Sequence, residues 1–477
     1  MAKGELTLEK RGKRKDVDMT QGDILRHIVV FALPLLAGNV FQQLYNMVDT
    51  IVVGQFVSNE AFAAVGSVGP IINTLIGLFL GFSSGAGVVV SQYYGAKQGE
   101  NVKKTVHTSI LVTLILVVIF TAVGILITPL SLKMMKLEEG TLVFDEAKSY
   151  LTIYFAGVIG LMIYNIGSGI LRAVGDSKRP FIYLVVSAVL NTILDLVFVL
   201  VFSMGVEGVA YATIIAQFVS AVLVMISLMR AKSSVRFSFK DMKIDLDMLK
   251  KILSVGLPAS LQMAITSFSN IFVQSYINYF DTSCMGGWTA YSKVDQFILL
   301  PMQSVSLAAT TFVGQNLGVG NEKRARQGAR ISLLLAMIST VVLTIIVEIF
   351  APSLVMLFNT DSEVVEYGSM FLRWLSPFYV LCCINQIYSG VLRGAGNSKV
   401  PMFIMLGSFV VFRQIYLFVM SNYIANEALP IALGYPAGWL VCSVIIFIYY
   451  RKCSLIRSSV VEGIENLSGS DADKDEE

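Results

Sequence analysis

LRAVGDSKRP at residues 171–180 and LRGAGNSKVP at residues 392–401 are two copies of one motif, 221 residues apart. Three ordered matches at a nearly constant offset indicate an internal duplication, and the slight drift indicates loops of different length. The chain therefore consists of two similar halves in tandem. The other two matches, at offsets of 223 and 224 residues, pair Gln92 and Gly95 with Gln315 and Gly318, and Pro34 and Asn46 with Pro258 and Asn270.

The composition around these motifs excludes a water-soluble protein. Of the 477 residues, 55% are hydrophobic and only 14% are charged, whereas a soluble domain carries about 25% charged residues. A span needs roughly 20 mainly apolar residues, and such runs occur twelve times, the fourth at 147–171 and the tenth at 367–392. The predicted fold class is an all-α membrane protein with twelve transmembrane helices.

The basic residues indicate the direction of the spans. All but six of the 36 Lys and Arg lie in the N-terminal tail, in alternate loops or in the C-terminal tail. Because cytoplasmic loops are enriched in Lys and Arg, this alternation places both termini in the cytoplasm. We expect a multi-pass protein of the bacterial inner (plasma) membrane.

The even number of spans in each half determines how the halves are related. Both halves enter the membrane in the same direction, so a pseudo-twofold axis lies along the membrane normal and the substrate cavity lies between two six-helix bundles. Two lobes on a flexible linker suit alternating access by rocking. The predicted domains are a cytoplasmic N-terminal tail (1–25), an N-lobe (26–230), a cytoplasmic linker (231–247), a C-lobe (248–453) and an acidic, disordered C-terminal tail (454–477).

Metal, redox and catalytic motifs are missing from the sequence. Its five cysteines and two histidines have no metal-ligand spacing, and we find no GxxxxGK, no HExxH and no nucleophile triad. We therefore expect no metal, no cofactor, no enzymatic activity and no direct use of ATP. The expected partners of a monomeric chain are membrane lipid and a small-molecule substrate, and not nucleic acid, because the basic residues follow membrane topology.

Two carboxylates interrupt apolar spans of the first half. Asp49 lies in the first span, and Asn191 and Asp195 share one face of the fifth. Ionisable residues inside a membrane are costly and mark functional sites. Because two nearby carboxylates cannot easily both stay ionised, Asp49 and Asp195 are candidates to share a proton or a cation. Gln42 and Asn46, on the Asp49 face, either line the substrate cavity or join helices through hydrogen bonds.

The second half lacks this acidic pair. The positions corresponding to the two carboxylates are Val273 and Tyr416. The spans of this half contain Lys293, Asp295 and Arg413 instead. These three residues either form a structural ion pair, with Arg413 neutralising Asp295, or belong to the substrate cavity, and both interpretations stay open here.

Several of these segments resemble the multidrug and toxic compound extrusion (MATE) family. The similar segments are YNMVDT at 45–50 with Pro34 and Leu35 before it, the repeated Leu-Arg-x-x-Gly-x-x-x-x-Pro motif, and VGQNLG at 313–318. The resemblance covers residues 22–453. It implies two six-helix bundles around a V-shaped cavity and export of amphipathic, often cationic compounds, coupled to inward flow of H⁺ or Na⁺.

Within that family the chain resembles the DinF-type branch more than the NorM-type branch. The NorM-type branch uses acidic residues in spans seven and ten, where this chain has Thr266 and Cys382. The resemblance therefore implies coupling in the N-lobe, by H⁺ rather than Na⁺, although the same groups suit Na⁺. The residues that match the N-lobe cation site of the DinF-type branch are Asp49, Asn191, Asp195 and Thr213.

An alternative function is that of a flippase for lipid-linked precursors or polysaccharides, because related families share a similar bundle. Such proteins usually have a cavity with several basic residues, to which Lys293 and Arg413 would contribute. A comparison of dye efflux with translocation of lipid-linked sugars distinguishes the two functions.

Overall fold

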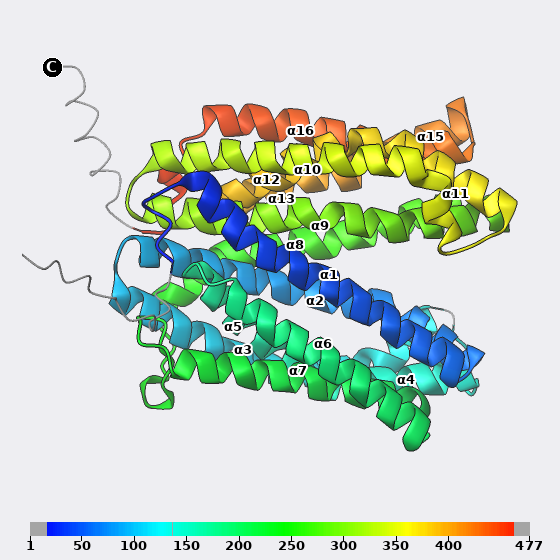
Figure 1. Ribbon diagram of the computed structural model, residues 1–477, viewed down its shortest axis with the longest axis horizontal. Helices are drawn as coiled ribbons and strands as arrows, with labels where there is room; N and C mark the ends of the chain where they lie inside the picture. The colour runs from blue at the N-terminus through cyan, green and yellow to red at the C-terminus, as the bar shows by residue number, and fades with distance from the viewer. Residues whose placement is uncertain (1–16, 136, 462–477) are drawn as a thin grey trace, which may run out of the picture.

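The computed structural model describes residues 17–135 and 137–461, and every regular element in these ranges is helical (Figure 1). The first half contains α1 (Ile24–Phe56), α2 (Asn59–Gly95), α3 (Gly99–Met134), α4 (Leu142–Ala156), α5 (Val158–Ala173), α6 (Lys178–Leu196) and α7 (Gly205–Met229). The second half contains α8 (Leu246–Ile277), α9 (Thr282–Gly318), α10 (Glu322–Met356), α11 (Ser362–Leu375), α12 (Tyr379–Gly394), α13 (Lys399–Leu406), α14 (Arg413–Val419), α15 (Ala428–Ala432) and α16 (Gly434–Lys452). Three π-helical turns continue α6, α13 and α14: Val197–Val201, Gly407–Phe412 and Met420–Ile424.

The number of spans agrees with the prediction, but the fourth span differs in shape. Eleven helical segments of the described chain are long and apolar enough to cross a membrane, and α4 with α5 forms a twelfth, broken span. The predicted span 147–171 is bent by 47° where α4 meets α5. Gly157 separates the two helices and packs against Ile214 of α7, which leaves no room for a side chain. The bend thus brings α4 against its neighbours at a different angle from α5.

Short polar side chains begin many of the helices. The Asp245 carboxylate accepts hydrogen bonds at 3.1 Å from the backbone N–H groups of Asp247 and Met248 at the start of α8. Such caps satisfy donors that have no partner within the helix. The bond from Met248 is the main reason that the pKa of Asp245 is held below its ordinary value. The same role belongs to Asp23, Ser58, Asp281, Asn321 and Asp361.

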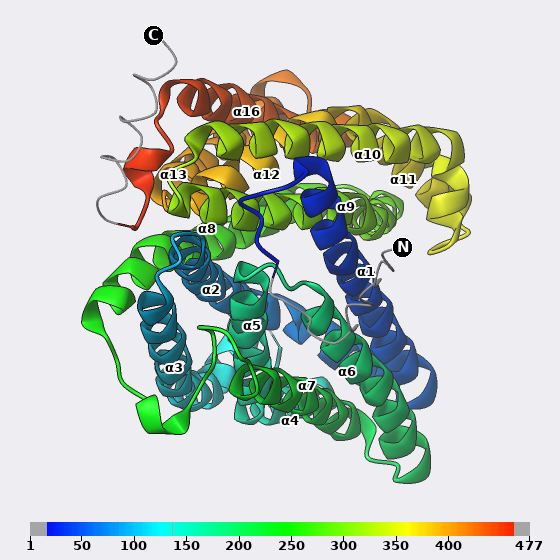
Figure 2. The same cartoon turned by 60° about the vertical axis from the view of Figure 1, so that its left-hand side comes forward.

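Two bundles are visible in both ribbon views, and α1 crosses from one to the other (Figures 1 and 2). We call α1–α7 the N-lobe and α8–α16 the C-lobe. Helix α1 contacts both α9 of the C-lobe and α6 of the N-lobe. The largest contact between the lobes is a seam between α2 and α8, where Gly81 meets Ser260 and Gly85 meets Gly256. Small residues allow membrane helices to approach closely, so this seam holds the lobes tightly together.

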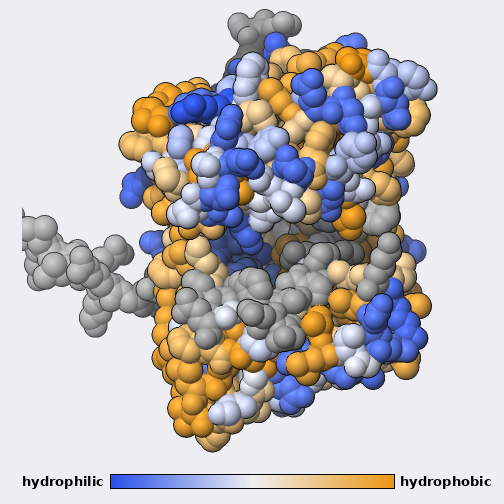
Figure 3. All heavy atoms as spheres, turned by 90° about the vertical axis from the view of Figure 1, so that its right-hand side faces the viewer, coloured by the Kyte–Doolittle hydropathy of each residue, from blue (hydrophilic) through white to orange (hydrophobic). Residues whose placement is uncertain are grey.

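The lobes touch at one end of the bundle and separate at the other. We call the end that contains residues 17 and 461 the terminal end. From Gly81 to Gly95, α2 runs toward the terminal end in contact with the C-lobe. The space-filling view from the opposite end shows a recess between the two lobes (Figure 3). The protein is therefore closed at the terminal end and open at the opposite end.

Parts of both predicted tails belong to the packed structure. Met19 is 1% exposed and Val461 is 5% exposed. A 3-10 turn at Ile456–Ser458 lies inside the segment that we expected to be disordered. The remaining residues of the predicted tails, 1–16 and 462–477, lie outside the described residues.

Candidate cation-coupling site

The structure brings Asp49 of α1 and Asp195 of α6 into contact. Helices α1 and α6 pack side by side, and the two carboxyl groups lie within hydrogen-bonding distance of each other. Asp195 is fully buried. A hydrogen bond between two carboxyl groups requires a proton on one of them, since ionised carboxylates only accept. The contact between the two carboxyl groups is therefore compatible with one proton between them.

Polar atoms around this pair have few partners. Apart from the contact between the carboxyl groups, Asp49 Oδ1 and both carboxylate oxygens of Asp195 accept no hydrogen bond from the described residues. The side-chain amide of Asn191, one turn before Asp195 on α6, is equally buried and equally unpaired in the described structure. Buried polar groups are nearly always hydrogen-bonded in proteins. Unsatisfied atoms from three adjacent side chains thus indicate a place for an exchangeable proton, ion or water.

Tyrosines from α1 and α4 surround the acidic pair. The Tyr150 hydroxyl interacts with both carboxylates and is hydrogen-bonded to Thr213 of α7. Tyr154 lies one turn further along α4 and is hydrogen-bonded to Gln217. The predicted site residue Thr213 is thus linked to the carboxylates through Tyr150, and its own hydroxyl donates to the Val209 carbonyl at 3.0 Å. These hydroxyl groups are polar neighbours of the acidic pair.

The tyrosines were missed in the sequence, although a weak signal exists. Tyr150 and Tyr154 are four residues apart, which places them on one face of α4, and their rings lie 6.4 Å apart. Tyr45 precedes Asp49 by four residues on α1 and is hydrogen-bonded to Gln42, a predicted cavity residue. Asn46, the other predicted residue of this face, is exposed. Helical spacing from a membrane carboxylate could have identified Tyr45.

Asp295 of the C-lobe lies in a tyrosine cluster of its own. The Tyr379 hydroxyl donates to Asp295 Oδ1, and Tyr291 is hydrogen-bonded to the same carboxylate. The hydroxyl groups of Tyr379 and Tyr291 are 3.5 Å apart. Lys293 is exposed, so the structure does not bring it to Asp295.

Arg413 has partners other than Asp295. Its guanidinium donates at 2.8 Å both to Ser269 Oγ and to Asn270 Oδ1, and it stacks over the Tyr435 ring at 4.7 Å from the centroid. Tyr435 interacts with both Arg413 and Asp295. Among the described residues, Arg413 and Asp295 form no direct ion pair, and the Tyr435 ring lies against the guanidinium.

The C-lobe positions that correspond to acidic sites have structural roles. Tyr416, the counterpart of Asp195, donates to the Pro430 carbonyl at 3.1 Å, and Val273, the counterpart of Asp49, is fully buried. Thr266 donates to the Gln262 carbonyl of its own helix at 2.7 Å. Cys382 is buried and has a free thiol. The acidic pair therefore belongs to the N-lobe alone.

Comparison with known proteins identifies the family. The MatE family profile matches residues 34–197 and again residues 258–419. The probable multidrug resistance protein YpnP of Bacillus subtilis is 30% identical over 438 residues, covering 92% of this chain and 97% of that relative. The chain belongs to the MATE family of transporters. It is thus a multi-pass membrane transporter with bacterial homologues and not an enzyme.

Other members of the MATE family support the same fold. The probable multidrug resistance protein NorM of Thermotoga maritima is 27% identical over 92% of this chain and 96% of that relative. A crystal structure of MATE in complex with MaL6 superposes with a TM-score of 0.87 at 24% identity, over 92% of this chain and 98% of that one. The outward-facing conformation of a multidrug resistance MATE family transporter of the MOP superfamily gives 0.86 at 24% identity, with the same coverage.

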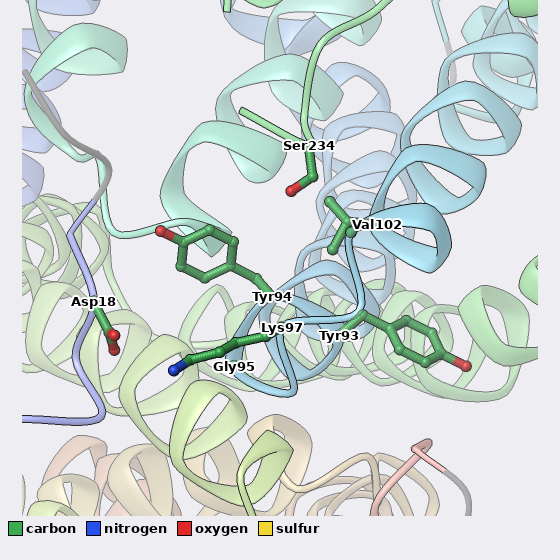
Figure 4. A pocket seen from close by; sticks show the side chains of 8 residues that line it. Asp18, Tyr93, Tyr94, Gly95, Lys97, Val102 and Ser234 are labelled. Carbon is green, nitrogen blue, oxygen red and sulfur yellow. The ribbon is translucent and has the colours of Figure 1, made fainter. Parts of the chain in front are cut away.

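Two cavities of this MATE transporter lie away from the acidic pair. A cavity of about 220 Å³ lies where α2 meets α3 at the terminal end, and Asp18, Tyr94 and Lys97 are among the side chains that line it (Figure 4). A second cavity, of about 650 Å³, is lined by residues of α3 and the linker, including Lys103 and Asp241. Neither cavity contains a predicted site residue. In the described ranges, no three His, Cys, Asp or Glu side chains gather where they could hold a metal ion.

Proposed function

We propose that this MATE transporter is an antiporter that exports amphipathic, often cationic small molecules, driven by inward proton flow through the Asp49–Asp195 pair. The observation that carries the proposal is the contact between the half-buried Asp49 and the fully buried Asp195. Asp49 Oδ1 and both oxygens of Asp195 have no other described partner. Loss of the shared proton adds a negative charge to the N-lobe. Protonation therefore changes the relative affinity for a cationic substrate, which is what coupling between the two states requires.

A proton fits this arrangement better than Na⁺. Two carboxyl groups in contact can share a proton directly, whereas a bound metal cation would separate them and collect several oxygen ligands around itself. Tyr150 and Thr213 are already hydrogen-bonded to each other. Together with the non-acidic Thr266 and Cys382, this favours the DinF-type branch of the family. The names of the relatives, probable multidrug resistance proteins, support the substrate class.

The orientation of the protein follows from its basic loops. We place the terminal end in the cytoplasm of a bacterial cell, because alternate loops and both tails carry nearly all Lys and Arg. The recess between the lobes then opens outward. We keep the division into an N-lobe at 26–230, a linker at 231–247 and a C-lobe at 248–453, with cytoplasmic tails at 1–25 and 454–477.

A lipid-linked precursor flippase has less support. Its case rested on basic residues in the spans, but Arg413 is engaged by Ser269 and Asn270. Lys293 is exposed. Of the two basic residues named for this function, only Lys293 is left without a described hydrogen bond to another side chain, because the Arg413 guanidinium is held in the C-lobe.

The test is efflux from proteoliposomes with a pH gradient and a Na⁺ gradient imposed separately. The fluorescent cation ethidium serves as the transported probe. We expect a pH gradient alone to drive efflux by the wild type, and D49N and D195N to be inactive although they insert and fold. The control D247N neutralises an exposed carboxylate at the start of α8 and should transport normally. Full efflux by both D49N and D195N, or efflux driven only by Na⁺, contradicts the proposal.

A further inference from the structure

Two glutamines at the terminal end connect the lobes in a reciprocal way. Gln92 of α2 donates its side-chain N–H to the Gly394 carbonyl of the C-lobe at 2.8 Å. Gln315 of α9 donates to the Ala173 carbonyl of the N-lobe at 2.9 Å. Both glutamines are fully buried. Gln92 and Gln315, which donate, occupy equivalent positions in the two halves of the duplication. Ala173 and Gly394, which accept, occupy the same position in the two copies of the Leu-Arg motif. Each lobe therefore makes the same contact with the other.

A pair of duplicated glycines allows this contact. Gly95 lies against the Gln315 backbone carbonyl, and Gly318 lies against the Gln92 backbone carbonyl. A Cβ on either glycine would overlap the oxygen that it faces. The α2 and α9 backbones thus touch where the side chains are absent, and each glutamine is held directly at the boundary between the lobes.

The N-terminal segment is attached to one of these glutamines. We call residues 17–20 the N-terminal strap. The Met19 N–H donates to Gln315 Oε1 at 2.9 Å, and the Val17 N–H donates to the Val174 carbonyl at 3.1 Å. Gly175, with φ +85°, adopts a left-handed conformation that brings its loop against Val17. The N-terminal strap therefore joins the N-lobe to the glutamine of the C-lobe.

The C-terminal segment repeats this arrangement with the lobes exchanged. We call residues 458–461 the C-terminal strap. The Val460 N–H and the Ser459 hydroxyl donate to Gln92 Oε1 at 2.8 and 2.9 Å. Gly396, with φ +98°, is the duplicated counterpart of Gly175 and lies against the Ser458 carbonyl. The C-terminal strap joins the C-lobe to the glutamine of the N-lobe.

We propose that Gln92 and Gln315, together with the two straps, are the gate that closes the cytoplasmic side of this transporter. The lobes cannot separate at the terminal end without releasing both amides and both straps. Each broken bond is replaced by a bond to water when the gate opens, so the net free-energy cost per bond is modest. The gate can therefore open in every transport cycle. The location of the gate rests on the proposed orientation, but its existence does not depend on the acidic pair or the coupling ion.

A cysteine reporter placed above the gate tests this inference. Ser260 of α8 is 5% exposed and faces Gly81 in the seam between the lobes. In S260C, a membrane-impermeant maleimide reaches the reporter from the cytoplasm only when the gate is open. Cys453 is the one native cysteine that is not buried. The S260C reporter is therefore introduced into a C453S protein, and C453S alone gives the background labelling. Inside-out and right-side-out vesicles report on the two faces of the membrane separately.

The gate variants are Q92A and Q315A, each of which removes bonds across the boundary. We expect each to raise the labelling rate of the reporter about fivefold or more from the cytoplasmic side, as the loss of two or three modest hydrogen bonds implies. Labelling from the outer side should not rise. The matched control is Q98A, because Gln98 is also on the terminal end but its side chain bonds only to Asn101 of its own lobe in the described structure.

The C-terminal strap is tested by V460P, which removes the N–H donor to Gln92 Oε1. Val460 lies outside the transmembrane helices. Ser459 already has the extended backbone (φ −60°, ψ 139°) that a following proline requires. We expect a smaller rise in labelling, about twofold, with a normal amount of folded protein. The proposal is overturned by unchanged labelling in Q92A and Q315A, or by an equal rise from both faces, which would show general loosening. A rise from the outer face alone would keep the gate and overturn the proposed orientation.

Discussion

An added methyl group at Gly85 should force the lobes apart. The Cβ of an alanine there would lie 2.6 Å from the Gly256 backbone and from the Ile252 carbonyl of α8. Carbon atoms in contact normally lie about 3.5–4.0 Å apart, so α2 and α8 would have to separate by about 1 Å. Both neighbours are backbone atoms, which cannot rotate away. The clash exists only while the seam is closed, and it is relieved when the lobes open at the terminal end.

The size of this effect follows from the cost of overpacking. An extra methylene in a tightly packed site costs about 1–3 kcal/mol, which shifts a two-state equilibrium by roughly 5- to 150-fold. Alanine also gains about 1 kcal/mol over glycine in a helix. Two control variants on the same helix share this gain. G77A places the Cβ at an ordinary 3.5 Å from Met263, and G69A meets no described atom within 4 Å.

The assay is the labelling rate of the S260C reporter in inside-out vesicles, together with thermal unfolding of the purified variants. We expect G85A to be labelled at least about fivefold faster than G69A, with G77A close to G69A. Because the helix-propensity gain is common to all three, the difference isolates the clash in the seam. Equal labelling and equal unfolding temperatures of G85A and G69A would refute the packing argument.

Three further outcomes are expected. Y379F should lower the stability of the C-lobe by about 1–3 kcal/mol in thermal unfolding, since the half-buried Asp295 carboxylate loses a donor. An unchanged unfolding temperature would contradict that role. R413K should also destabilise the protein, because lysine cannot both stack on Tyr435 and donate to two acceptors in the plane of a guanidinium. The control is R373K, at a largely exposed position. Equal stability of R413K and R373K would count against the role of Arg413. D245A should cost about 0.5–2 kcal/mol through loss of the α8 cap. Because the folded-state pKa of Asp245 is lowered, this difference should be fully present at neutral pH, begin to shrink below about pH 4 and vanish only as the pH falls through the lowered folded-state pKa. A difference that is the same at pH 7 and at the acid end of the titration would speak against the cap.

Patterns within single helices carried most of what could be predicted from the sequence. Twelve spans follow from apolar runs, and the spacing from Asn191 to Asp195 places both on one face of α6. Asp49 can contact Asp195 only if α1 and α6 are neighbours. The resemblance to a family implied that packing, whereas the spacing of residues along the chain could not show it. The bend lies at Gly157, where the chain packs against Ile214 of α7, and the sequence of α4 and α5 does not show that contact.

The terminal segments show what a sequence hides when contacts are distant along the chain. Residues 17–20 and 458–461 belong to the segments that we expected to be cytoplasmic tails, yet the Met19 and Val460 N–H groups bond to glutamines more than 290 residues away. The duplication drew attention to Gln92 and Gln315, but their side chains could equally have faced their own lobe. Only the packing of the two lobes shows that each amide reaches across the boundary.

In the proposed mechanism, the Asp49–Asp195 pair exchanges a proton for substrate. The direct measurement is calorimetric titration of ethidium into the purified transporter in buffers with different ionisation enthalpies. We predict that the wild type releases about one proton per ethidium bound, as expected for two coupled carboxyl groups that share a proton, in Na⁺ and in choline alike. The variants D49N and D195N should release none. Binding enthalpies that are independent of the buffer, or equal proton release from D195N, would contradict the assignment.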